Sequence, residues 1–151
     1  MIRTFIPILL ILLATGCATT DTSTQSAKSK FAPPTGMSAI RMESGRGRIP
    51  LMGASIWLDT IDGKDRRKFD KGEDGFYLIP VGKHEVGLGW ASSYLSSFAF
   101  VSFEMKPGRT YLAYAKHVPR AIEFWIVDSE SGELVEPRQL AGIANKPPIF
   151  R

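Results

Sequence analysis

Residues 76–90 read Phe-Tyr-Leu-Ile-Pro-Val-Gly-Lys-His-Glu-Val-Gly-Leu-Gly-Trp, two apolar segments on either side of a turn. The segment 75–80 is rich in aromatic and branched residues and predicts a β-strand. The four residues 80–83 predict a tight turn in which Gly82 adopts a positive φ. Residues 84–90 alternate, so they predict a strand with two unlike faces. One face holds His84, Val86, Leu88 and Trp90, and the other holds Glu85, Gly87 and Gly89.

The same alternation of short apolar runs and turns continues on both sides of this stretch. Further strands are predicted at 38–43, 54–61, 98–105, 111–116 and 122–128, with turns at 62–63, 106–109 and 128–133. No segment from residue 37 onward keeps a helical period over three turns. About seven strands in about one hundred residues are typical of small all-β sandwiches. We therefore expect a single antiparallel β-sandwich over 37–135, with brief pairing at 134–135, and an irregular tail over 136–151.

The N-terminal sixteen residues differ from the rest in composition. Arg3 is followed by an apolar run over 5–14, which is too short for a bilayer span of roughly twenty residues. Small residues then precede Cys17, the single cysteine of the 151 residues. A charged start, a short apolar core and small residues before the break predict a secretory signal peptide over 1–16.

The sequence Ala14-Thr15-Gly16-Cys17 resembles the lipobox of bacterial lipoproteins, with Ala14 where that family prefers Leu. The resemblance implies that Cys17 receives a diacylglyceryl group, that cleavage occurs just before it, and that its amine is then acylated. Two or more acyl chains anchor a protein stably to a membrane. The residue after Cys17 is Ala18 and not Asp, which in this family implies sorting to the outer membrane with the domain facing the periplasm. Inner-membrane retention and surface exposure stay open. The alternative is an incidental cysteine behind an ordinary signal peptide.

Residues 17–36 join this anchor to the expected domain. Small polar residues dominate the segment and prolines close it, so it cannot bury enough apolar surface to order itself. We expect a flexible tether.

Two turns and one hairpin of the expected domain are similar to known bacterial domains. The turns lie in 76–86 and 103–111, and the hairpin in 122–135. Together they resemble PEGA-like domains and other small β-sandwich domains of unknown function in bacterial lipoproteins. The resemblance implies an immunoglobulin-like or transthyretin-like sandwich and carries over no catalytic residue, because turn chemistry specifies fold rather than activity.

Residues for catalysis or metal binding are few. One cysteine forms no intramolecular disulfide or Cys-rich zinc site, and the histidines are His84 and His117 alone. We expect His84 to stabilise its turn and His117 to lie in a solvated loop. The hydrolase elbow, zinc-protease and phosphate-loop motifs are absent from the sequence. The aspartates between 59 and 74 do not have calcium-loop spacing and alternate with basic residues. We expect no enzyme activity, no cofactor and no metal.

Two segments are candidates for binding. Trp90, Tyr94 and Phe98 are separated by serines, a composition similar to that of adaptable binding loops. The alternative is that these aromatic side chains fold back on the core. Arg66, Arg67 and Lys68 are a candidate contact for anionic lipid or lipopolysaccharide headgroups, with a solvated hairpin loop as the alternative. Despite the net charge of +4, nucleic acid is not an expected partner, because the signal peptide directs the chain out of the cytoplasm.

The sequence therefore favours a non-enzymatic, lipid-anchored binding or accessory module of the cell envelope, with a membrane contact through its anchor and an envelope protein or glycan as partner. The alternative is a docking subunit of a secretion or pilus-type assembly.

Overall fold

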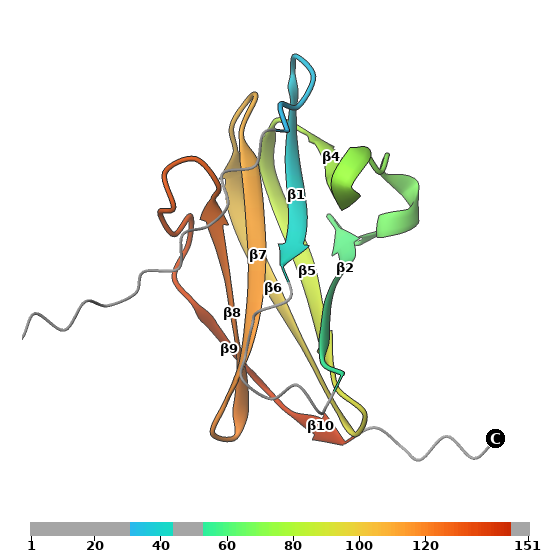
Figure 1. The fold of residues 1–151 in the computed structure, drawn as a ribbon, viewed down its shortest axis with the longest axis vertical. Helices are drawn as coiled ribbons and strands as arrows, with labels where there is room; N and C mark the ends of the chain where they lie inside the picture. The colour runs from blue at the N-terminus through green and yellow to red at the C-terminus, as the bar shows by residue number, and fades with distance from the viewer. Residues whose placement is uncertain (1–30, 44–52, 146–151) are drawn as a thin grey trace, which may run out of the picture.

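The computed structural model describes residues 31–43 and 53–145, which form ten strands and two short 3₁₀ helices, with no α-helix in these ranges (Figure 1). The strands are β1 Met37–Glu43, β2 Ser55–Ile61, β3 Lys64–Asp65, β4 Tyr77–Pro80, β5 Gly82–Ala91, β6 Leu95–Met105, β7 Thr110–Val118, β8 Ala121–Asp128, β9 Gln139–Gly142 and β10 Ala144–Asn145. The 3₁₀ helices are η1 Arg66–Lys68 and η2 Glu73–Gly75. The all-β expectation is confirmed.

The strands form two five-stranded sheets. Sheet A has the order β4-β1-β7-β8-β9, and sheet B has the order β10-β6-β5-β2-β3. Alternate side chains of both sheets meet in one apolar core, as the period of two in a strand requires. Its largest fully buried members include Tyr111, Phe124, Leu58 and Leu88. The inward face predicted for residues 84–90 agrees with this core for Val86, Leu88 and Trp90.

All seven predicted strands occur in the structure, as β1, β2, β4, β5, β6, β7 and β8. Three short strands were not predicted, and two of them, β9 and β10, lie in the segment expected to be irregular. That expectation is wrong for residues 139–145, because β9 pairs with β8 and β10 pairs with β6. These three strands, two to four residues long, carry too little alternation to be recognised in the sequence.

Sheet A is mixed rather than wholly antiparallel. β1 pairs antiparallel with β4 on one side and parallel with β7 on the other, with Ala39 opposite Thr110. The predicted seven-stranded antiparallel arrangement is corrected at this pair. The turn predicted at 80–83 has the expected positive φ at Gly82, 129°, and it carries the chain from β4 in sheet A to β5 in sheet B.

The packed domain begins before the predicted boundary at residue 37. The ring of Phe31 stacks on that of Phe76, with centroids 4.7 Å apart, and its carbonyl oxygen accepts a hydrogen bond from the Thr110 hydroxyl. A second, small apolar cluster of Ala39, Phe76 and Leu112 lies here, outside the main core. The expected tether is therefore corrected for residues 31–36. Its remainder, Cys17, the signal peptide and residues 146–151 lie outside the described residues.

Candidate functional site

The predicted aromatic binding loop is divided between the interior and the surface. Trp90 is 7% exposed, belongs to β5 and packs in the core, so its prediction as a binding residue is wrong. Its ring stacks on that of His117 at a centroid distance of 6.2 Å. The stretch 90–98 is not a long loop, since β5 ends at Ala91 and β6 begins at Leu95.

Tyr94 and Phe98 are exposed, as a binding role requires. Tyr94, 71% exposed, lies in the short connection between β5 and β6. Phe98, 52% exposed, points from the outer face of sheet B and meets Trp57 edge to face at 5.8 Å. Phe100, two residues further along β6, is 61% exposed. We call Trp57, Phe98 and Phe100 the aromatic surface.

Two glycines of β5 make room for the aromatic surface. Gly89 is opposite Trp57 on one side and Phe98 on the other. A Cβ at Gly89 would lie 2.3 Å from the Trp57 ring, and one at Gly87 would lie 2.3 Å from the Thr60 hydroxyl oxygen. The side chains of β2 and β6 therefore lie across the backbone of β5. Trp57 and Phe100 were not among the predicted site residues, although the shared face of Gly87 and Gly89 leaves room for side chains of the neighbouring strands.

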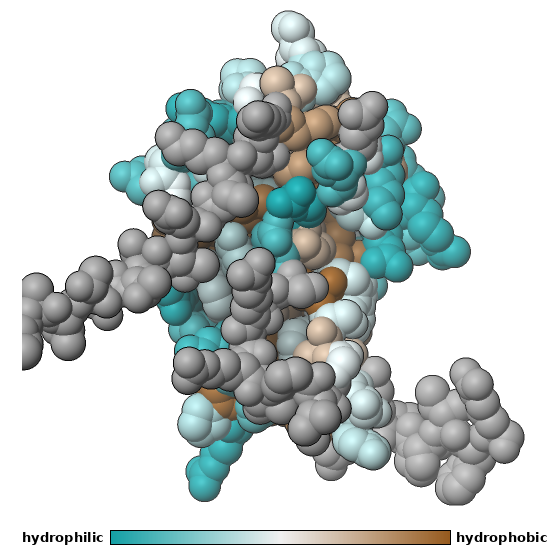
Figure 2. Space-filling model, viewed as in Figure 1, coloured by the Kyte–Doolittle hydropathy of each residue, from teal (hydrophilic) through white to brown (hydrophobic). Residues whose placement is uncertain are grey.

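The basic residues of η1 do not form one free cationic patch. The Arg66 guanidinium donates to the backbone carbonyl of Leu58, at the irregularity between Leu58 and Thr60 in β2. Arg67 forms a two-point ion pair with Asp65, and its guanidinium holds the pKa of that carboxyl well below its usual range. Lys68 is exposed. Figure 2 shows hydrophilic residues at the side where Figure 1 places η1 and η2.

His84 joins two turns. Its Nδ1 lies 2.7 Å from Asp62 Oδ2 and its Nε2 lies 2.9 Å from the Pro80 carbonyl oxygen. Asp62, at φ 51° in the turn before β3, also accepts a hydrogen bond from the Glu85 N–H. Partial burial raises the pKa of the Asp62 carboxyl, but the hydrogen bonds from Glu85 and His84 outweigh it and lower the pKa below 3.8. Both imidazole nitrogens are thus occupied by turn contacts.

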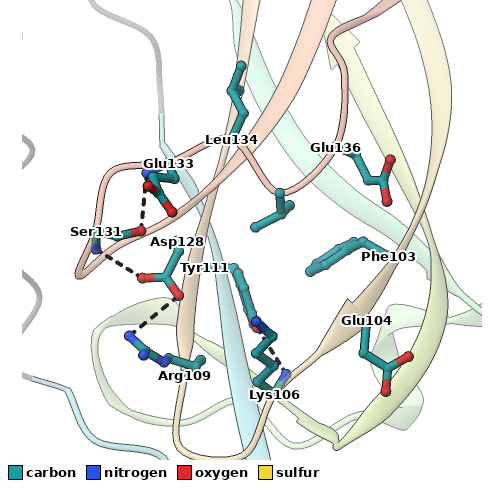
Figure 3. Close-up of a pocket in the computed structure, with 11 residues that line it drawn as sticks. Phe103, Glu104, Lys106, Arg109, Tyr111, Asp128, Ser131, Glu133, Leu134 and Glu136 are labelled. Carbon is teal, nitrogen blue, oxygen red and sulfur yellow. Dashed lines mark hydrogen bonds and ion pairs between the residues drawn. The ribbon is translucent and has the colours of Figure 1, made fainter.

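A hollow of about 360 Å³ opens at one end of the sandwich, between β6 and the segment after β8 (Figure 3). Its lining comprises Phe103, Glu104, Lys106, Arg109, Tyr111, Asp128, Ser131, Glu133, Leu134, Val135 and Glu136. The rings of Phe103 and Tyr111 pack edge to face at 5.1 Å. The Tyr111 hydroxyl accepts a hydrogen bond from the Lys106 N–H, and burial raises the pKa of Tyr111.

Some charged side chains around the hollow form ion pairs and others do not. Arg109 forms ion pairs with Asp128 and Glu130. The carboxylates of Glu104, Glu133 and Glu136 form no ion pair with any cation in the described part of the chain. The hollow therefore combines an apolar floor with an acidic rim.

Comparison with protein-family models, with curated proteins and with solved structures finds no match to this chain. Its function must therefore be argued from these surfaces. Within residues 31–43 and 53–145, no three or more His, Cys, Asp or Glu side chains gather as a metal site. No helix in the same ranges is long and apolar enough to cross a membrane.

Replacing Gly89 by Ala tests the packing under the aromatic surface. The added Cβ collides with the Trp57 ring, so we expect the free energy of unfolding to fall by about 1–3 kcal/mol. Gly142→Ala is the matched control: no atom lies within 4 Å of a Cβ there, and its effect should stay within about 0.5 kcal/mol. Urea unfolding measures both. Equal stability of Gly89→Ala and wild type would show that Trp57 does not lie over Gly89.

Replacing Asp62 by Asn tests the turn contacts of His84. Because the pKa of Asp62 is lowered in the folded chain, its carboxylate stabilises the fold above the unfolded pKa of 3.8. That stabilisation is lost as the pH falls through the folded pKa. The wild type should therefore lose more unfolding free energy than Asp62→Asn between neutral pH and about pH 3. Urea unfolding at the two pH values measures this, and an identical loss in both proteins would contradict it.

Proposed function

We propose that the chain is a lipid-anchored, non-enzymatic binding module of the cell envelope, which contacts its partner along the β6 side of sheet B. The observation that carries the proposal is the aromatic surface. Phe98 and Phe100 are both exposed on β6, and the ring of Phe98 meets that of Trp57. Exposed apolar clusters of this kind mark interaction sites. The anchor is Cys17, and the partner is an envelope protein or glycan.

The site chemistry supports a binding role rather than catalysis. The two imidazoles of the chain are engaged elsewhere: His84 with two turns and His117 with the ring of Trp90. Neither lines the hollow beside β6. The residues of that hollow offer shape, apolar contact and charge.

We further infer that the domain is related to the immunoglobulin-like or transthyretin-like sandwiches of bacterial lipoproteins and to PEGA-like domains. The support is the pair of packed sheets and the positive φ at Gly82 and Gly108 in the two turns that carry the resemblance. The parallel pairing of β1 with β7 departs from the wholly antiparallel sandwich that we predicted from the resemblance.

A second candidate function is a docking subunit of a secretion or pilus-type assembly. The observation that favours it is the length of β6, most of which has no backbone pairing with a strand other than β5 in the described residues. A subunit of this kind would have one dominant partner in a large complex.

The anchor is tested by Cys17→Ser. Without the thiol no thioether to diacylglycerol forms, so the variant should lose the lipid label and leave the membrane fraction. Metabolic labelling with a palmitate analogue and separation of inner and outer membranes measure this, with the exposed Ser93→Ala as a control that keeps Cys17. A Cys17→Ser chain that stays labelled and membrane-bound would refute the proposed anchor.

The binding surface is tested by photo-crosslinking in cells with a photoreactive residue at Tyr94, in the exposed connection that precedes β6. We expect a discrete adduct that disappears in the Phe98→Ser/Phe100→Ser background, because those rings supply the apolar contact. The same probe at Lys116, an exposed residue of sheet A, should not give the adduct. An adduct at Tyr94 that is indifferent to both phenylalanines would reject this surface.

A further inference from the structure

Over most of its length β6 lacks a paired strand on the side away from β5, although β9 of sheet A lies close to β6. We call this side the open edge. On one side β5 pairs with it from Ser96 to Met105. On the other side β10 pairs with Leu95 and Ser96 alone. After β9 the chain crosses from sheet A to sheet B. At this crossing the Ser97 hydroxyl donates to the Gly142 carbonyl oxygen at 2.8 Å. From Phe98 onward, no strand in the described residues pairs with this edge of β6.

The ladder between β5 and β6 shows which backbone groups face the open edge. The Ser92 N–H donates to the Leu95 carbonyl oxygen, so these residues form a hydrogen-bonded pair. In an antiparallel ladder such pairs alternate with pairs whose N–H and C=O groups point away. The residues of β6 whose backbone N–H and C=O groups face the open edge are therefore the even-numbered ones. Ser96, which pairs with Ala144 of β10, agrees with this assignment.

From Phe98 to Glu104, β6 has no lysine, no proline and no β-bulge. Edge strands are commonly protected by lysine, proline or a β-bulge. The residues whose backbone groups face the open edge are Phe98, Phe100, Ser102 and Glu104. The register between β5 and β6 is uninterrupted. An exposed row of unpaired donors and acceptors is a template for another strand.

Both faces of an added strand would find contacts already in place. Its inward side chains would enter the hollow, whose lining includes Phe103 and Tyr111 (Figure 3) and also Val135. Its outward side chains would lie beside Phe100, Ser102 and Glu104, because directly opposed residues in a sheet are close neighbours. The hollow is thus where an extra strand of sheet B would complete the sandwich.

The charges select the partner. Glu104, Glu133 and Glu136 have no described ion-pair partner, and Lys106 is the lining cation outside the Arg109 ion pairs. A second copy of this chain, paired β6 to β6, would bring two such acidic rims together. A segment with basic residues on its outward side would place them beside Glu104 instead.

We propose that the edge of β6 from Phe100 to Glu104 accepts an extended, basic segment of a partner protein as an added strand of sheet B, with its apolar residues in the hollow. This inference rests on the proposed binding function and names the partner's chemistry. Main-chain hydrogen bonds supply the affinity in this mode, and the alternate pockets supply the specificity.

The probe is a capped, fluorescent peptide Thr-Lys-Val-Lys-Val-Lys-Thr, titrated with the full chain in a non-ionic detergent and followed by anisotropy. It should bind at least about tenfold more tightly than the same peptide with Glu for Lys. Two further versions carry methyl groups on alternate backbone nitrogens, in opposite phases. One phase removes the donors that face β6 and should abolish binding, whereas the other should retain it.

The matched variants are Ser102→Pro and Ser102→Ala. Because the N–H of Ser102 faces outward, proline there leaves the β5 ladder intact but removes a donor and blocks the edge. We expect Ser102→Pro to weaken the Lys peptide at least about tenfold and Ser102→Ala to leave it unchanged, with the same far-ultraviolet circular dichroism in both. Should proline unfold the chain, Glu104→Gln/Glu136→Gln is the second variant, and it should weaken the Lys peptide and not the Glu peptide.

Three results would overturn the proposal. They are equal binding by the two methylated phases, binding that is indifferent to Ser102→Pro in a folded chain, and a dimer in sedimentation that Ser102→Pro dissociates. The last would make a second copy the occupant. If the Lys peptide fails to bind while the Tyr94 crosslink still depends on Phe98 and Phe100, the binding function stands and strand addition is rejected.

Discussion

The structure depends on the long ladder between β5 and β6, which pairs every residue from Gly82 to Ala91 with one from Met105 to Ser96. This ladder determines, in both strands at once, which side chains face the core and which face solvent. On the inward side it places Val86 and Leu88 against the core, and on the outward side it places bare glycine backbone under Trp57 and Phe100. A slip by one residue would reverse these faces, so the core and the aromatic surface are specified together.

Much of the fold was predictable, because alternation and turn residues are local signals. The inward row of β6 follows from its spacing alone, and this spacing also places Phe98 on the opposite face. What could not be predicted is which sheet each strand joins. β4 and β5 are adjacent in the chain but lie in different sheets, and nothing in residues 80–83 distinguishes a crossover from a hairpin.

The candidate sites show the same limit at the level of side chains. Trp90 and Phe98 have similar chemistry and similar neighbours in the sequence, yet one is buried and the other exposed because they have opposite phases in paired strands. Trp57 reaches Phe98 across β5 only through the register of three strands. The hollow was likewise out of reach, since its walls come from β6 and from the segment after β8.

The parallel pairing of β1 with β7 also affects how the chain reaches its native state. β1 lies inside sheet A, between β4 and β7, so the first strand of the described residues needs a neighbour that comes much later. Contacts between such distant segments close long loops and form slowly. During synthesis, β1 leaves the ribosome well before β7. Sheet A would then assemble late, around an already formed β5–β6 hairpin.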